Sequence, residues 1–244
     1  VHDDIIDEAA IRRGRTSINY RWGNNLTVLV GDYIFMHSMS MALADGDLDV
    51  LRLLSSVTIR MIEGEILGLE QNGRPDLSME DYFEIVGRKT GALFGACCRI
   101  PAYLVQDVSE TTATALYNYG FNLGVCFQLI DDLLDFTSST EILGKPALSD
   151  LKEGKVTLPL ILTMPLATPE ERELISRIAT LKSFDGVDPL EILHIVNRYD
   201  SLEKTRAIAR DYARRARAGL EPFPDSPARE MLDLALDFVL ERDR

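Results

Sequence analysis

The chain has 244 residues, which is enough for one large domain with a substantial core. It carries 39 acidic and 26 basic residues, for a net charge of −13. Such an acidic surface repels nucleic acid and anionic lipid, and the sequence has no basic patch that would offset this repulsion. We therefore expect no nucleic-acid partner.

Three cysteines, Cys97, Cys98 and Cys126, lie in apolar stretches without the C-x-x-C spacing of a zinc site. We expect them to be small core residues in a reducing compartment, which favours a cytoplasmic protein. Asp32 and Arg99 interrupt the most apolar stretches before these reach the roughly 18 residues of a membrane-spanning helix. No integral membrane segment is therefore expected.

Helix signals dominate the sequence. Capping patterns predict helix starts at Ser78-x-x-Asp81, Thr168-Pro169 and Asp188-Pro189. Apolar residues recur at steps of three and four, which predicts one buried helix face made of Leu116, Tyr119, Leu123, Phe127, Ile130 and Leu134. A long apolar helix is also predicted over 82–103. The fold class is therefore all-α.

Polar segments at 72–76 and 138–154 are predicted loops, and the Asp-Gly pairs at 45–46 and 185–186 are predicted turns between helices. No repeat or low-complexity linker divides the chain, so residues 1–244 are expected to form a single domain. Because the chain starts at Val1 with a motif already under way, we expect the natural protein to have further N-terminal helices.

Two aspartate clusters share the spacing D-D-x-x-D, at residues 3–7 and 131–135. Asp3 and Asp7 are four residues apart, as are Asp131 and Asp135, so the two residues of each pair share one face of a helix. Their two carboxylates repel each other unless a cation is present. Oxygen ligands without Cys or His favour Mg²⁺, which takes one or two carboxylates plus substrate phosphate oxygens. A solvated acidic face would explain one such cluster. Two with the same spacing favour a Mg²⁺ site, and at least one carboxylate of the second should point inward.

Basic residues accompany both clusters. Arg12 and Arg13 follow the first cluster, and although an arginine pair is ordinarily a solubility feature, beside an acidic metal site its guanidinium groups suit phosphate binding. Lys89 and Thr90 lie within the apolar helix, where the lysine could also extend outward to solvent. Gln128 comes almost one turn before the second cluster.

Two further lysines, Lys145 and Lys155, bracket the loop after the second cluster, and both could be solvated loop residues. His2 abuts the first cluster and is expected to pack against a helix or support the site rather than act as a base. No serine or cysteine is positioned as a nucleophile.

The motifs taken together resemble the trans-polyprenyl diphosphate synthase family, of the medium- or long-chain bacterial type. The matching segments are Asp3 to Glu8, Arg12-Arg13-Gly14, Gly31-Asp32, Glu63-Gly64-Glu65, Lys89-Thr90, Gln128 to Asp135 and Gly144-Lys145. The match is collinear from Val1 to the final Leu240-Glu241-Arg242-Asp243-Arg244, so it covers essentially the whole chain.

The resemblance implies an isoprenoid synthase fold, a helical bundle around a central cavity, and usually a homodimer. It implies head-to-tail condensation of isopentenyl diphosphate with an allylic diphosphate (dimethylallyl, geranyl or farnesyl) to a longer all-trans polyprenyl diphosphate, through Mg²⁺-dependent ionisation. The products would be of the octaprenyl, solanesyl or geranylgeranyl kind.

The resemblance also assigns roles to residues of this chain. Asp3, Asp7 and Asp131 would ligate Mg²⁺ with Asp135 close by, and Asp4 and Asp132 would support them. Asp3, Asp7, Asp131 and Lys89 would be catalytic. Arg12 would hold the allylic diphosphate, Arg13 the diphosphate of isopentenyl diphosphate, and Lys89, Thr90, Gln128, Lys145 and Lys155 would line the allylic site.

Three alternatives share parts of this pattern. A terpene cyclase would be expected to show an Asn/Asp, Ser/Thr, Glu triad in place of residues 131–135. A non-catalytic subunit of a heteromeric synthase would have degraded aspartate motifs, whereas both are whole. A head-to-head condensing enzyme would not be expected to carry Arg12-Arg13 after its first motif. The family's remaining isopentenyl diphosphate ligands, and the residues that set product length, would precede Val1.

Overall fold

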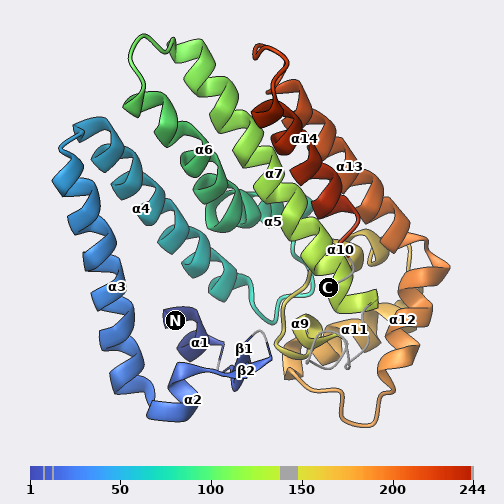
Figure 1. The fold of residues 1–244 in the computed structure, drawn as a ribbon. Coiled ribbons are helices and arrows are strands. Elements are labelled where there is room, and N and C mark those ends of the chain that lie inside the picture. The colour runs from blue at the N-terminus through green and yellow to red at the C-terminus, as the bar shows by residue number, and fades with distance from the viewer. Residues whose placement is uncertain (8, 13, 138–147, 243–244) are drawn as a thin grey trace. The chain divides into compact units, whose positions relative to one another are not determined.

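The structure, a computed structural model, describes residues 1–7, 9–12, 14–137 and 148–242, and within these ranges it is helical apart from one short hairpin (Figure 1). The all-α prediction is therefore confirmed. The elements are α1 His2–Ile6, β1 Ile11–Arg12, β2 Arg15–Thr16, α2 Ile18–Trp22, α3 Asn24–Asp45, α4 Leu48–Gln71, α5 Met79–Val86, the π-helix η1 Gly87–Gly91, α6 Ala92–Leu104, α7 Glu110–Thr137, α9 Ser149–Lys152, α10 Leu158–Thr163, α11 Pro169–Leu181, α12 Pro189–Arg198, α13 Ser201–Ala218 and α14 Pro227–Leu240.

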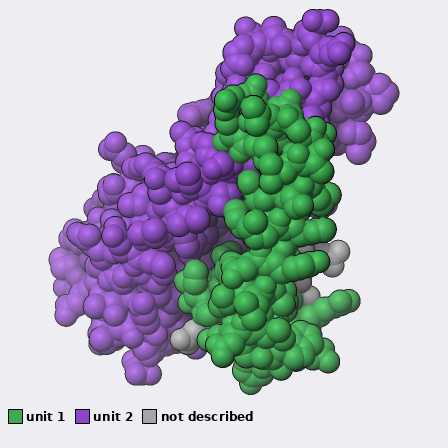
Figure 2. All heavy atoms as spheres, turned by 90° about the vertical axis from the view of Figure 1, so that its left-hand side faces the viewer, with its two compact units in different colours: residues 1–52, 139–146 green, residues 53–138, 147–244 purple. Residues whose placement is uncertain are grey.

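The described residues divide into two compact units, coloured separately in Figure 2. Unit 1 holds those up to Arg52, and unit 2 holds those from Leu53 onward. The first aspartate cluster therefore belongs to unit 1 and the second to unit 2. The prediction of a single domain over 1–244 stays a prediction.

The core of unit 2 is built around α7, which has α6 on one side and α13 and α14 on the other (Figure 1). The predicted apolar face of α7 packs into this core, and two of its residues, Tyr119 and Ile130, are almost inaccessible to solvent. Cys126 is fully buried, as expected, and Cys98 packs against the same core. The prediction was wrong for Cys97, which is exposed.

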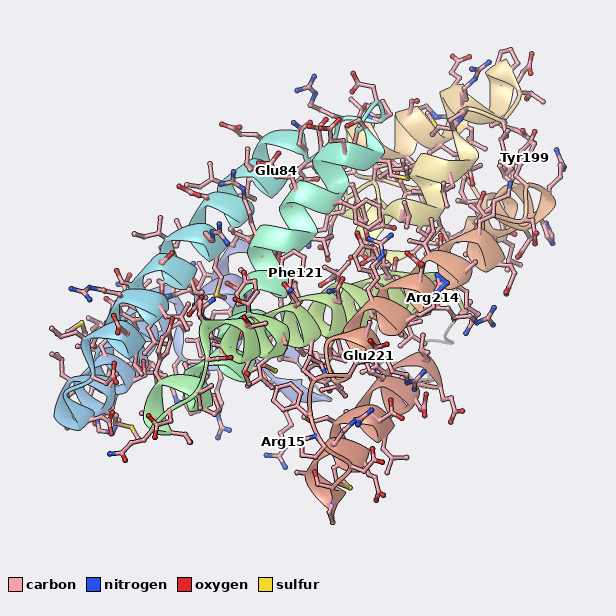
Figure 3. The ribbon with its side chains drawn as sticks, turned by 90° about the horizontal axis from the view of Figure 1, so that it is seen from above. Arg15, Glu84, Phe121, Tyr199, Arg214 and Glu221 are labelled. Carbon is pink, nitrogen blue, oxygen red and sulfur yellow. The ribbon has the colours of Figure 1, made fainter. Side chains whose placement is uncertain are left out.

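Glycines bring α6 and α7 unusually close together. A Cβ atom added at Gly120 would lie 2.3 Å from the backbone oxygen of Phe94, and one added at Gly124 would lie 3.1 Å from the Cα of Gly91. Phe121, labelled in Figure 3, lies on the side of α7 that faces η1, and its ring would be 2.9 Å from a Cβ at Gly91. Side chains larger than hydrogen would therefore push the two helices apart.

The predicted helix starts are confirmed by their caps. The hydroxyl of Ser78 accepts a hydrogen bond from the Asp81 N–H at 3.0 Å, and Thr168 begins α11 with a full capping box. The Asp188 carboxylate accepts from the Leu190 N–H at 2.9 Å. Each side chain satisfies a backbone donor that the first turn of a helix leaves without a partner.

Two predictions of local structure need correction. The apolar helix after Ser78 is not uniformly α-helical, because η1 interrupts it with a π-helical turn over Gly87–Gly91. The predicted loop at 138–154 contains a short helix, α9, which begins at Ser149; residues 138–147 lie outside the described part of the chain. The loop at 72–76 and the turns at 45–46 and 185–186 lie between helices as predicted.

Helix α3 of unit 1 is apolar but largely exposed, and only Thr27 and Gly31 of its 22 residues are buried. By length and composition alone it could cross a membrane, with a mean hydropathy of 1.3. We expected Asp32 to interrupt this stretch before it was long enough to span a membrane. That expectation was wrong, because a single charge does not exclude the helix by length and composition. Such a helix is weak evidence for a span, because many apolar helices of other kinds pass the same test.

Candidate active site

The second aspartate cluster lies near the end of α7, on a turn with three different environments. Asp132 and Asp135 are buried, with 3% and 8% of their surface exposed, whereas Asp131 is exposed. The prediction that at least one carboxylate points inward is confirmed. Buried carboxylates require donors, and those donors show how the cluster is held.

Asp132 receives one hydrogen bond on each carboxylate oxygen. The Tyr82 hydroxyl of α5 donates to Oδ2 at 2.5 Å, and the Gln128 amide donates to Oδ1 at 2.9 Å. Burial raises the pKa of Asp132 to about 6, against the lowering effect of these two donors, and the neighbouring carboxylates raise it further. Burial also raises the pKa of Tyr82 well above its usual value, so this hydroxyl is a neutral donor.

Asp135 holds the start of α9. Its Oδ1 accepts from the backbone N–H and the hydroxyl of Ser149, both at 3.0 Å, and its Oδ2 accepts from the Asp150 N–H at 3.1 Å. Burial, and then the charge of Asp135, raise the pKa of Asp150 well above its usual value. Asp135 therefore fixes the start of α9, and its role as a metal ligand stays a prediction.

Asp131 is bound by an arginine that the sequence did not single out. The Arg242 guanidinium donates to Asp131 Oδ1 at 2.5 Å and lies 4.5 Å from the centre of the Phe127 ring. The Arg242 side chain is only 16% exposed. Because the two partners are 111 residues apart, no local spacing could have indicated this contact.

Lys89 and Thr90 lie on the π-helical turn η1, facing different neighbours. Lys89 forms an ion pair with Glu65 of α4, so its ammonium group is not simply extended into solvent. The Thr90 hydroxyl donates to the Gln128 side-chain oxygen at 3.1 Å. Gly64 allows α4 to approach, since a Cβ there would lie 2.8 Å from the Lys89 backbone nitrogen. Unit 2 therefore links Thr90 and Gln128 of the predicted site to the second cluster, whereas the Lys89 side chain is directed to Glu65.

Unit 1 holds the first cluster on the short helix α1. Asp3 and Asp7 lie one turn apart, since the Asp7 N–H donates to the Asp3 carbonyl at 2.8 Å. Asp4 is buried and accepts from Nε of Arg12, on β1, at 2.7 Å. The hydrogen bond to Asp4 raises the pKa of the Arg12 guanidinium. Arg12 is therefore positioned by Asp4 while about half of its side chain, 49%, stays exposed.

His2 packs over α3, as expected. Its Nε2 lies 3.1 Å from the Val28 carbonyl oxygen, and Gly31 leaves room for its ring. Lys155 forms an ion pair with Glu153 at 2.7 Å. Arg13 and Lys145 lie outside the described residues, so their predicted roles in diphosphate binding stay predictions.

The described residues do not gather three His, Cys, Asp or Glu side chains closely enough to hold a metal ion by themselves. A cation such as Mg²⁺ uses one or two carboxylates and completes its shell with substrate and water oxygens. Asp131 fits such an ion, because its exposed carboxylate already holds the positive charge of Arg242.

The sequence model of the polyprenyl synthetase family matches residues 1–194. The chain belongs to the polyprenyl synthetase family. It is 39% identical over 245 residues to octaprenyl diphosphate synthase of Escherichia coli, covering 100% of this chain and 75% of that one. It is 41% identical over 244 residues to a prenyl transferase of Cyanophora paradoxa, covering 99% and 73%.

Solved structures agree with this family assignment. A polyprenyl synthase from Caulobacter crescentus, complexed with calcium and isoprenyl diphosphate, matches with a TM-score of 0.93 and 34% identity over 100% of this chain and 74% of its own. A decaprenyl diphosphate synthase from Rhodobacter capsulatus matches with a TM-score of 0.92 and 34% identity, over the same shares. The predicted family, its isoprenoid synthase fold and its activity class are confirmed: the chain is a prenyltransferase of isoprenoid biosynthesis.

Proposed function

We propose that this polyprenyl synthetase condenses isopentenyl diphosphate with dimethylallyl, geranyl or farnesyl diphosphate, head to tail, to a longer all-trans polyprenyl diphosphate. The observation that carries the proposal is the cluster in unit 2. There the exposed carboxylate of Asp131 lies on the same helix as Gln128, which is hydrogen-bonded to Thr90. Carboxylate, ammonium and neutral donors are the groups that bind a cation and a diphosphate together.

The proposed resident metal is Mg²⁺, held by Asp3, Asp7, Asp131 and Asp135. All four donors are carboxylates, which suits a hard cation. The calcium ion of the Caulobacter crescentus relative is also a hard cation that takes oxygen ligands. When bound, Mg²⁺ would neutralise the negative charge that develops on the departing diphosphate.

The residues of the chain itself would bind and orient the diphosphate. Lys89 supplies a positive charge, and its ammonium group is held by the ion pair with Glu65. The diphosphate, which carries more negative charge than one carboxylate, would replace Glu65 as its partner. Gln128 supplies an amide donor oriented by the hydrogen bond from Thr90, and Arg12 supplies a guanidinium already ordered by Asp4. Preordered charges of this kind contribute most where charge changes during the reaction.

The proposed reaction breaks the bond between the allylic carbon and the diphosphate oxygen and forms a carbon–carbon bond to isopentenyl diphosphate. One proton then leaves, and the released diphosphate accepts it. We propose products of medium or long chain length, supported by the two-residue spacer of the first cluster and by the Escherichia coli octaprenyl relative.

We also propose that the protein is a homodimer. Leu29, Tyr33 and Met36 recur at steps of four and three on α3 and are 64%, 68% and 60% exposed. A stripe of this kind marks a protein or membrane contact. Asp32 lies in the middle of the same helix and would cost about 3 kcal/mol at the centre of a bilayer, so a second copy of the chain is favoured over lipid.

Light scattering after gel filtration tests the dimer. Tyr33→Glu is expected to give monomers, whereas Phe238→Glu, at a residue that is 71% exposed on α14, should leave the dimer intact. Binding of the wild-type protein to lipid vesicles, without self-association, would contradict the proposal. A cytoplasmic location is proposed as well, since all three cysteines are free thiols; cell fractionation tests it.

Chain elongation is the decisive test of the activity. The protein would be incubated with Mg²⁺, labelled isopentenyl diphosphate and each allylic primer, and the products separated by chain length. We expect elongation that stops when Mg²⁺ is chelated. No elongation with any primer would contradict the enzymatic proposal and favour a non-catalytic subunit, and a cyclic hydrocarbon product would favour a terpene cyclase.

A further inference from the structure

Tyr82 is a buried side chain that none of the assigned roles uses. It lies on α5 with 5% of its surface exposed, and its hydroxyl donates to Asp132, which is 50 positions later in the chain. Its ring packs edge-on against Phe83, whose ring in turn contacts Tyr212 of α13. The ring is therefore held by packing, and the hydroxyl serves a separate purpose.

The hydroxyl of Tyr82 ends a chain of hydrogen bonds that joins α5, η1 and α7. Thr90 donates to the Gln128 oxygen at 3.1 Å, Gln128 donates to one oxygen of Asp132 at 2.9 Å, and Tyr82 donates to the other at 2.5 Å. Both carboxylate oxygens of Asp132 are thus engaged by the protein. Asp132 acts as an anchor within this network, and its two donors fix the rotation of the α7 turn that carries Asp131.

We propose that Tyr82 is a positioning residue, whose hydrogen bond to Asp132 holds the second aspartate cluster and the Thr90–Gln128 pair in place for a divalent cation and a diphosphate. This inference rests on the proposed function, because it takes Asp131 as a metal ligand. The reason is geometric. Without the hydroxyl, one oxygen of a buried carboxylate has lost its donor, and Asp132 must turn to find another. Such a turn displaces Asp131, its neighbour in the chain.

Direct metal binding tests the proposal without requiring turnover. Binding of Mn²⁺ in the presence of inorganic diphosphate can be followed by electron paramagnetic resonance in the wild type and in Tyr82→Phe. A hydrogen bond to a charged group is strong enough that its loss shifts an equilibrium about tenfold or more, so we expect Mn²⁺ to bind about tenfold more weakly. The Mg²⁺ concentration for half-maximal elongation should rise by a similar factor.

Tyr212→Phe is the matched control. It removes the hydroxyl of the third ring in this aromatic group, and that hydroxyl takes part in none of the described hydrogen bonds to the cluster. We expect it to bind Mn²⁺ like the wild type. Equal Mn²⁺ binding by both variants would overturn the proposal, whatever their thermal stability.

A second variant covers the case in which Tyr82→Phe does not fold. Asp132→Asn keeps the shape of the side chain but replaces one accepting oxygen with a donor, so it should weaken Mn²⁺ binding as well. In the double variant the two losses should be less than additive, because both substitutions disturb the same hydrogen-bonded group of Tyr82, Gln128 and Asp132. Unchanged binding by Asp132→Asn, or fully additive losses, would overturn the proposal. A wild type that binds Mn²⁺ but elongates nothing would contradict the proposed function and leave this inference standing.

Discussion

The close contact between α6 and α7 makes Gly120→Ala a sensitive test of the fold around the site. The new Cβ would lie 2.3 Å from the Phe94 backbone oxygen and 2.8 Å from the Cys98 sulfur. A carbon and an oxygen normally approach to about 3.3 Å, so the helices must separate by about 1 Å. The oxygen belongs to the α6 backbone and cannot rotate away.

The expected cost follows from two opposing effects. Overpacking a core by one methyl group costs typically about 1 to 3 kcal/mol, and a contact this short with backbone belongs at the upper end. Alanine also gains about 1 kcal/mol over glycine in a helix interior. We therefore expect Gly120→Ala to lower the free energy of unfolding by about 2 kcal/mol.

Gly68→Ala on α4 is the matched control. A Cβ there would lie 3.7 Å from the Ile85 Cγ2 atom, an ordinary contact, so only the gain in helix propensity remains. The two variants should differ by about 3 kcal/mol, or about 6 to 12 °C in the unfolding midpoint for a chain of this length. Urea and thermal denaturation followed by circular dichroism would measure this. Equal stability of the two variants would refute the close packing of α6 and α7 derived above.

Three further outcomes are expected. Asp131→Ala should lower turnover by orders of magnitude and lower the thermal midpoint only modestly, because Arg242 loses its carboxylate partner. Asp76→Ala, in an exposed loop, should change neither quantity, and a fully active Asp131→Ala would show that the Asp131 carboxylate takes no part in the mechanism. Hydrogen bonding to the Thr168 backbone lowers the pKa of Glu171, so its contribution to stability is present above its usual pKa and lost as the pH falls through the lowered one. The stability advantage of the wild type over Glu171→Gln should therefore shrink in acid denaturation series, and an advantage that grows would contradict this assignment. A thiol reagent at neutral pH should modify Cys97 first, since it is exposed. Cys98 and Cys126 should react slowly, because burial raises the pKa of Cys98 to about 11 and that of Cys126 to about 12. Mass spectrometry that finds all three thiols modified at the same rate would contradict the described burial.

The features that could be predicted from the sequence are those set by neighbouring residues. Ser78, Thr168 and Asp188 each bond to a backbone N–H two or three residues later, so a short segment contains the whole interaction. The apolar steps along α7 likewise follow from helix geometry alone. The aspartate spacing identified both clusters and the family for the same reason.

The features that could not be predicted depend on residues far apart in the chain. Asp132 has its donor Tyr82 on another helix, and Asp131 has Arg242 near the other end of the chain. The short helix α9 begins where Asp135 accepts its first backbone N–H groups, so a segment with loop composition becomes helical through a contact 14 residues away. Nothing in the local composition encodes such contacts.

The π-helical turn η1 has a consequence for how this site could change. A π turn is equivalent to an α-helix that has accepted one additional residue. Removal of one residue between Gly87 and Gly91 would therefore restore a regular helix in which α5 and α6 keep nearly the same relative rotation. Tyr82 would still face Asp132. The same deletion within the regular turns of α5 or α6 would instead rotate one part of the helix by about 100° relative to the other, so this turn is a place where the helix can change its length by one residue without breaking the Tyr82–Asp132 hydrogen bond.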